Sequence, residues 1–213
     1  MTDSDPGARS GTPAVPLVAA PVAPPPPDPA GPVDLLDEST RPRAPKHPAP
    51  APPVPGGTGT RLKLIHQGLR REMRRIRDAV QEVAAGRLDA ADARSEINRL
   101  GLTRNYRTLG AFCTAYSRTL TLHHTIEDQF MFPELRERQA SLGPVVERLE
   151  QEHEVIAETL ARLDAALVAL VHGGGGPDEV ERLTAVLDRT LSSHLGYEED
   201  ELLEPLDRLG IHV

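Results

Sequence analysis

Between residue 60 and the C-terminus, apolar residues recur at alternating steps of three and four, which keeps one face of a helix turned toward a partner. No stretch shows a strand pattern of comparable strength. Glycines follow the ends of the apolar patterns, as expected after helices. The pattern predicts an all-α fold, an up-down-up-down antiparallel four-helix bundle. Its long helices cover residues 61–85, residues 103 into the 130s, residues 144–172 and residues 177–209, with a short helix expected around residues 90–100.

The second long helix contains a proline that is expected to affect where the helix bends or ends. Its apolar face runs through Leu120, His123, Glu127 and Phe130, and Pro133 follows directly. Proline has no N–H to donate, and its ring clashes with the carbonyl of the preceding turn. The helix is therefore expected to kink or end at Pro133.

The first 59 residues differ in composition from the rest of the chain. They hold 17 of the 21 prolines and few large apolar side chains. Such a segment cannot bury enough surface to offset the entropy lost on ordering. We expect a disordered Pro/Ala-rich tail over residues 1–59 and a folded domain over residues 60–210.

Charge and cysteine content narrow the class of protein. The formal net charge of −8 indicates no nucleic-acid partner, and the single cysteine, Cys113, allows no internal disulfide. No apolar run approaches the roughly 20 residues that cross a bilayer, and the N-terminus lacks a signal-peptide pattern. The expected compartment is the cytoplasm, with no membrane partner.

Six ionisable residues occupy positions where an ordinary bundle carries leucine or isoleucine. A buried carboxylate is costly unless it is paired or bound to a metal, and none of these core positions is lysine or arginine. At ~1.5 Å rise per residue, all six fall in one layer near the same end of the bundle. The six are the candidate metal ligands His66, His123, Glu127, His153, His194 and Glu198.

The six residues form two similar sets, each with one histidine followed by His-x-x-x-Glu. This repetition indicates two metals with terminal histidines and two bridging glutamates. Imidazole with carboxylate suits Fe, Mn or Zn. Six protein ligands leave positions on two irons for water, hydroxide, O2 or NO. The alternative interpretation is a set of hydrogen-bonded polar groups in the core.

The order of these motifs resembles the hemerythrin-like, or HHE cation-binding, domains over about residues 61–209. The shared features are the lone His66, His123-His-x-x-Glu-Asp before Phe-Met-Phe-Pro133, Glu152-His-Glu, and His194-x-x-x-Glu-Glu. The resemblance implies that all six candidates are ligands of a non-haem di-iron centre. Members of this family bind O2 reversibly, sense redox state, NO or iron, or repair iron–sulfur clusters.

Two positions depart from the O2-carrying members of that family. Those members have a second histidine one turn along the third helix, where this chain has Ala157, and the loss is expected to open the site. Their last carboxylate ligand lies five residues after the final histidine, a position that Glu199 occupies in this chain. Glu198 is preferred here because it lies in the apolar stripe.

Several polar residues close to the candidate ligands are expected to play other parts. His124 is rotated ~100° from His123 around the helix and is expected at the surface or beside a ligand. Other acids are expected in solvent, with one of them able to orient a ligand imidazole. These acids are Asp128, Glu152, Glu154 and Glu199.

The favoured function is a di-iron protein that binds or senses O2, NO or peroxide and is not a classical enzyme. One alternative is a di-iron redox enzyme or an iron donor in stress or iron–sulfur repair. Another is a structural helical adaptor with zinc or no metal. The sequence names no protein partner.

Overall fold

The computed structural model describes residues 36–48, 54–85 and 115–211, and within these ranges it contains helices and turns but no strand. The all-α prediction is confirmed for this part of the chain. The longest elements are α1 (Thr58–Ala84), α4 (Gly143–Val171) and α5 (Pro177–Leu209).

A fourth helical stretch completes the bundle. Residues 115–126 are α-helical, and they continue through a π-helical turn, η3 (Glu127–Met131), into α3 (Phe132–Arg138). The short turn η4 (Ala140–Leu142) then leads into α4, and another short turn, η1 (Glu38–Thr40), lies far upstream.

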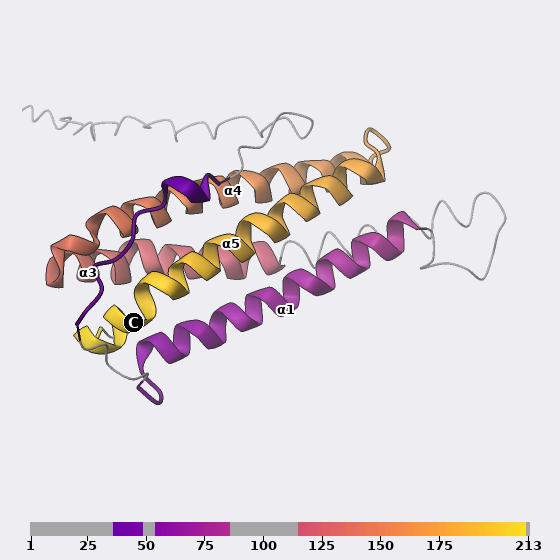
Figure 1. Cartoon of the computed structure of the whole chain (residues 1–213). Coiled ribbons are helices and arrows are strands. Elements are labelled where there is room, and N and C mark those ends of the chain that lie inside the picture. Colours follow the sequence, from indigo (N-terminus) through magenta and orange to yellow (C-terminus); the bar gives the residue numbers. More distant parts are fainter. Residues whose placement is uncertain (1–35, 49–53, 86–114, 212–213) are drawn as a thin grey trace, which may run out of the picture.

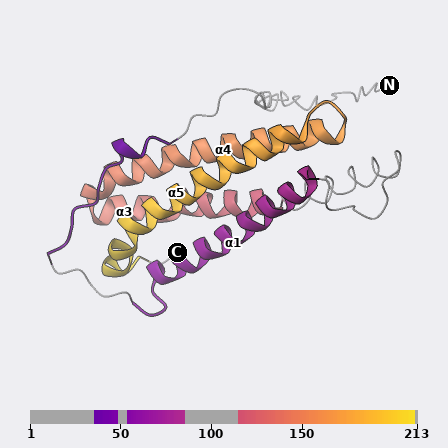
Figure 2. The same cartoon turned by 45° about the vertical axis from the view of Figure 1, so that its right-hand side comes forward.

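The four helical stretches lie side by side in both views of the chain (Figures 1 and 2). The start of α1 lies beside the end of α5, because the Thr58 hydroxyl donates to the Ile211 carbonyl and the Gly59 N–H donates to Asp207 at 3.0 Å. The predicted up-down-up-down order depends on residues 86–114. These residues, with the expected short helix, lie outside the described residues, so that order stays a prediction.

Close backbone packing between α1 and α5 requires a glycine at position 59. A Cβ added to Gly59 would lie 2.8 Å from the Leu203 carbonyl oxygen. We expect Gly59→Ala to lower the free energy of unfolding by about 1–3 kcal/mol, the usual cost of overpacking. Urea denaturation measures this, with Gly143→Ala as the control, since a Cβ there meets nothing within 4 Å. Equal stability of Gly59→Ala and wild type would contradict this packing.

Pro133 is accommodated by the π-helical turn and does not end the helix. The Phe132 N–H donates to the Glu127 carbonyl, five residues back, and α3 continues beyond Pro133. The wider turn supplies the room that the proline ring needs in the preceding turn. It also adds a residue to the helix face. Phe130, predicted to point inward, is 62% exposed, while Met131 and Phe132 are buried in its place.

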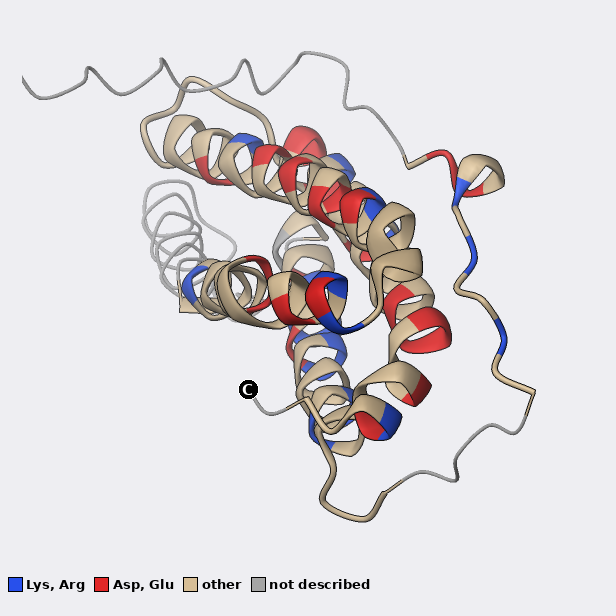
Figure 3. Cartoon of the chain, turned by 90° about the vertical axis from the view of Figure 1, so that its left-hand side faces the viewer, with Lys and Arg blue, Asp and Glu red and all other residues tan. Residues whose placement is uncertain are grey.

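Residues 36–48, which fall within the expected disordered tail, lie against α4 and α5. Arg41 and Arg43 form ion pairs with Glu152 and Glu201, and Figure 3 shows this segment beside the bundle with its basic residues in blue. Residues 54–59 are also placed, and α1 begins at Thr58. The remaining residues of the expected tail lie outside the described residues.

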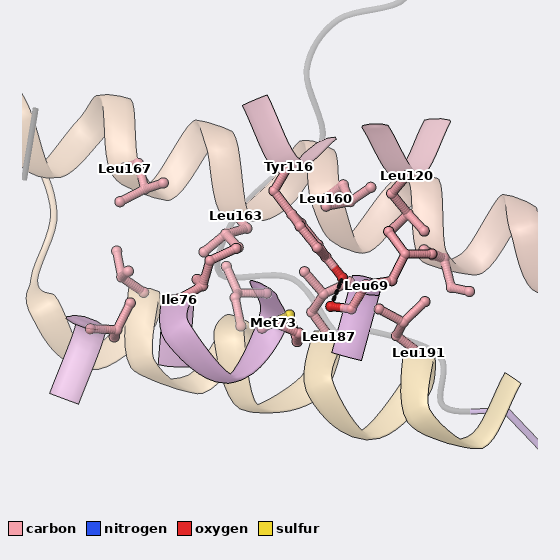
Figure 4. Packing of buried hydrophobic residues seen from close by; sticks show 14 of the residues in the cluster. Leu69, Met73, Ile76, Tyr116, Leu120, Leu160, Leu163, Leu167, Leu187 and Leu191 are labelled. Carbon is pink, nitrogen blue, oxygen red and sulfur yellow. Dashed lines mark hydrogen bonds between the residues drawn. The ribbon is translucent and has the colours of Figure 1, made fainter. Parts of the chain in front are cut away.

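Two apolar clusters fill the bundle, one on each side of a polar layer. One cluster contains Leu69, Met73, Tyr116 and Ile156, and the Tyr116 hydroxyl donates to the Leu69 carbonyl at 3.3 Å (Figure 4). The other contains Leu62, Phe132, Leu149 and Leu202, among others. Each long helix contributes to both clusters, so the residues between them are held at fixed positions. None of the described helices is long and apolar enough to cross a membrane.

Candidate metal centre

The polar layer contains all six residues selected from the sequence. Each lies on a helix between residues of the two apolar clusters, so the packing on both sides fixes its height. All six are buried, and His66, His194 and Glu198 have no exposed surface. The structure therefore brings together the side chains that the sequence placed in one layer.

One group of possible ligands comes from α1, the helix at residues 115–126, η3 and α5. The His66 Nε2 atom lies 3.1 Å from His123 Nε2 and 3.2 Å from a Glu198 carboxylate oxygen. His123 Nε2 lies 3.1 Å from Oε1 of Glu127. One ligand atom from each of these four residues lies within 4.8 Å of the others, close enough to hold one metal ion.

A second group consists of three histidines, and it includes a residue that the sequence analysis did not select. Ligand atoms of His124, His153 and His194 also lie within 4.8 Å of one another. The His124 ring stacks on His153 with centroids 3.9 Å apart. Of the two positions expected for His124, at the surface or beside a ligand, the surface position is wrong, since only 6% of the residue is exposed. His124 thus supplies a third imidazole where the sequence, with Ala157, indicated a gap.

Glu127 joins the two groups. Its Oε1 faces His123, and its Oε2 lies 3.6 Å from His153 Nε2. A carboxylate in this position suits a bridge between two cations. The repeated sequence halves are preserved only in part, because both glutamates belong with His66 and His123.

Most of the inward-facing atoms lack a hydrogen-bond partner. These atoms are both carboxylate oxygens of Glu127 and Glu198, and Nε2 of His124, His153 and His194. Buried polar atoms almost always have partners, and each exception calls for a reason. All of these atoms can act as lone-pair donors to a cation, so the donor set fits a metal centre.

Burial sets the charge of this layer. It lowers the pKa of His123 to about 3, and it lowers the pKa values of His124 and His194 as well, which keeps these imidazoles neutral. Burial, followed by the nearby Glu198 carboxylate, raises the pKa of Glu127. Neutral imidazoles therefore do not balance the two carboxylates, whereas divalent cations would.

Three of the histidines are oriented by carboxylates on their outer side. Nδ1 of His66 lies 3.1 Å from Glu199, that of His153 lies 2.8 Å from Asp128, and that of His194 lies 3.2 Å from Glu152. A hydrogen bond from Nδ1–H to a carboxylate leaves Nε2 free to bind a metal.

The neighbouring acids can now be assigned. Glu198 points into the layer, whereas Glu199 contacts His66 from outside and pairs with Arg70 at 2.5 Å. The preference for Glu198 over Glu199 agrees with this geometry. Glu154 is exposed. The Tyr197 hydroxyl donates to the Pro42 carbonyl at 2.8 Å and does not contact a histidine.

Comparison with known proteins agrees with the site. The family model described as the hemerythrin HHE cation binding domain matches residues 59–206. No match was found among curated proteins or among solved structures. The match covers more than half of the chain and includes every residue of the polar layer. The chain therefore belongs to the hemerythrin HHE cation-binding domain family.

Proposed function

We propose that this protein holds two iron ions in the polar layer and binds O2, NO or peroxide there. The observation that carries the proposal is the set of buried, partnerless donor atoms that converge from four helical stretches. One ion would be held by His66, His123 and Glu198. The other would be held by His124, His153 and His194, with Glu127 between the two ions.

The donor set supports iron over most other metals. Imidazole and carboxylate ligands suit Fe, Mn and Zn, and Cu(I) prefers sulfur. With seven protein residues for two ions, positions remain for a small exogenous ligand. Bound iron would supply the redox-active centre, and the protein contributes neutral imidazoles, two buried carboxylates and exclusion of bulk water.

A pocket beside the layer supports access by a small apolar ligand. It has a volume of about 310 Å³ and reaches His123 and Glu127. Its walls are mostly apolar and include Leu62, Ile65 and Met131. Among the residues of the layer, His123 has the largest exposed fraction, 8%. This pocket suits diatomic gases and peroxide better than large polar substrates.

Metal analysis tests the proposal directly. We expect about two iron ions per chain after expression in iron-replete medium. Before chelation, a free metal concentration of 1,000 times the Kd of a site stabilises the protein by about 4 kcal/mol for that site. Chelation should lower the free energy of unfolding by the same amount. Elemental analysis and thermal unfolding before and after chelation measure both effects. A protein without iron or manganese, whose stability is unchanged by chelators, would contradict the proposal.

The amount of O2, NO or peroxide taken up per iron pair distinguishes a binding protein from an enzyme. We expect the reduced protein to bind NO or O2 in proportion to its iron pairs, with a new absorption band. Sustained consumption of peroxide with an added reductant would favour a redox enzyme instead. Zinc in place of iron, with no response to either ligand, would favour a structural adaptor.

A further inference from the structure

A short segment upstream of the bundle is attached to the ligand layer through one buried arginine. We call residues 37–44 the strap. Its ends are held by Arg148, which donates to the Asp37 carbonyl at 2.7 Å, and by Glu201, which accepts from the Ala44 N–H at 2.6 Å. In Figure 1 it appears in indigo beside α4.

Arg41 lies at the centre of the strap and is the residue that enters the bundle. Only 7% of its side chain is exposed. Its Nε and Nη2 donate to the two carboxylate oxygens of Glu152 at 2.8 and 2.9 Å. The guanidinium also lies 4.7 Å from the centre of the Tyr197 ring, and its Nη1 donates to the Ser193 hydroxyl at 2.9 Å. Planar, bidentate contacts of this kind are specific to arginine.

Glu152 connects Arg41 to a candidate metal ligand. The same oxygen that accepts from Arg41 Nη2 lies 3.2 Å from Nδ1 of His194. Glu152 is 1% exposed, so its position depends on the groups that hold it. Arg148 also donates to Glu152, from one turn earlier on α4. Loss of Arg41 would leave Arg148 as the arginine that holds Glu152, and the hydrogen bond between Glu152 and His194 would loosen.

The three orienting carboxylates differ in what holds them. Glu199 pairs with Arg70 on α1, within the bundle. Asp128, which orients His153, is 38% exposed. Among the described residues, Glu152 is the orienting carboxylate that has a partner outside the long helices, Arg41, in addition to Arg148 on α4. The contact between strap and layer is therefore located at the His124/His153/His194 group.

We propose that Arg41 is a positioning residue for His194, acting through Glu152, so that strap docking and metal binding at the His124/His153/His194 group stabilise each other. The proposal rests on the two-metal function. A cation on Nε2 of His194 strengthens the Nδ1–H bond to Glu152, and a fixed Glu152 holds His194 in its ligand orientation. Linkage of this kind is reciprocal. The docked strap must therefore raise the metal affinity by the same factor by which bound metal raises the equilibrium constant for strap docking.

Cobalt(II) titration of the full-length protein tests this coupling. We expect Arg41→Ala to weaken one of two Co(II) affinities, that of the His124/His153/His194 group, by about 10–100-fold and to leave the other near its wild-type value. Arg41→Lys keeps the charge and loses the bidentate contact. Its Co(II) affinity should lie between those of the wild-type protein and Arg41→Ala. Arg43→Ala is the matched control, because Arg43 lies on the same strap, is 69% exposed and pairs only with Glu201 among the contacts described. It should leave both affinities unchanged.

Two further measurements read the coupling without any activity. Amide hydrogen exchange in the strap should slow when Co(II) fills the His124/His153/His194 group of the wild-type protein, and this response should vanish in Arg41→Ala. In the metal-free protein, the ¹⁵N shifts of His194 should report the Nδ1–H tautomer, and Arg41→Ala should mix the tautomers. Unchanged exchange and shifts, or equal losses in Arg41→Ala and Arg43→Ala, would overturn the role of Arg41.

The outcomes separate this proposal from the function on which it rests. Wild-type protein that binds two metals with a strap indifferent to them overturns the coupling alone. Wild-type protein that binds neither cobalt nor iron overturns the two-metal function and the coupling together.

Discussion

Replacing both Glu127 and Glu198 with glutamine is expected to abolish metal binding and to make the metal-free protein more stable. In the proposed two-metal site these carboxylates would be the anionic ligands, and a glutamine amide is a poor substitute. In the metal-free protein, however, the layer contains acceptors in excess, since both carboxylates and the inward Nε2 atoms lack partners. Glutamine N–H groups would donate to the inward Nε2 atoms, and the layer would no longer hold buried carboxylate charge.

The expected gain is about 1–4 kcal/mol in the free energy of unfolding of the metal-free protein, the range found when buried ion pairs are replaced by uncharged residues of similar volume. The variant should contain no iron, and added metal should not raise its stability. Elemental analysis and urea denaturation after chelation measure these effects. Glu154→Gln is the control, because Glu154 is the exposed neighbour of His153 and should change neither quantity.

The same comparison has a defined pH dependence. Burial and Glu198 raise the pKa of Glu127, so the native metal-free protein binds a proton that the unfolded chain releases. Stability from this group therefore falls as pH rises through the raised pKa. The advantage of the double variant should therefore grow as pH rises above the ordinary pKa of a glutamate. Glu198, whose pKa is lowered to about 2, stays ionised over this range and adds no slope of its own. A double variant that retains two irons would contradict the assignment of both carboxylates.

Much of the polar layer could be predicted because residue type and helical period are both visible in a sequence. His66, His153 and His194 each replace an apolar residue at a core position, and a helix of regular pitch carries that position inward. Glu127 and Glu198 follow by the same reasoning. Carboxylates at core positions of otherwise apolar stripes indicate a charge that the sequence itself does not contain.

Two errors come from treating each helix as having one narrow inward face. His124 is rotated by ~100° from His123, but a helix with neighbours on both sides buries a wider arc, so both histidines face the layer. The missing histidine at position 157 indicated a more open site and did not point to His124. Phe130 was misplaced because the π-helical turn adds a residue, and helical period alone does not reveal such a turn.

The position of the strap could not be read from the sequence for a different reason. Residues 36–48 have no apolar period, and their prolines resemble those of the preceding tail. They are held by ion pairs and hydrogen bonds to Glu152, Glu201 and Tyr197. Such contacts depend on which acids the bundle buries, and that is known only once the helices are packed.

Replacing His124 with phenylalanine is expected to reduce the metal content from two ions to one. Phenylalanine keeps a ring against His153 and removes both nitrogens, so packing is largely retained while the His124/His153/His194 group loses an imidazole. Residues that only hydrogen-bond to a ligand contribute about 10–100-fold to affinity, so loss of a ligand should cost more. The other ion should remain, because His124 does not belong to its group.

Titration with Co(II) and elemental analysis of the iron-loaded protein measure the change. His172→Phe is the control, since His172 is exposed and contacts the Val168 carbonyl at the end of α4. It should retain two ions. A histidine introduced at Ala157 should not rescue His124→Phe, because Ala157 is exposed and the third imidazole of the group comes from the neighbouring helix. Two ions bound with wild-type affinity in His124→Phe would show that His124 only packs against His153, and the second ion would then need its third ligand from water.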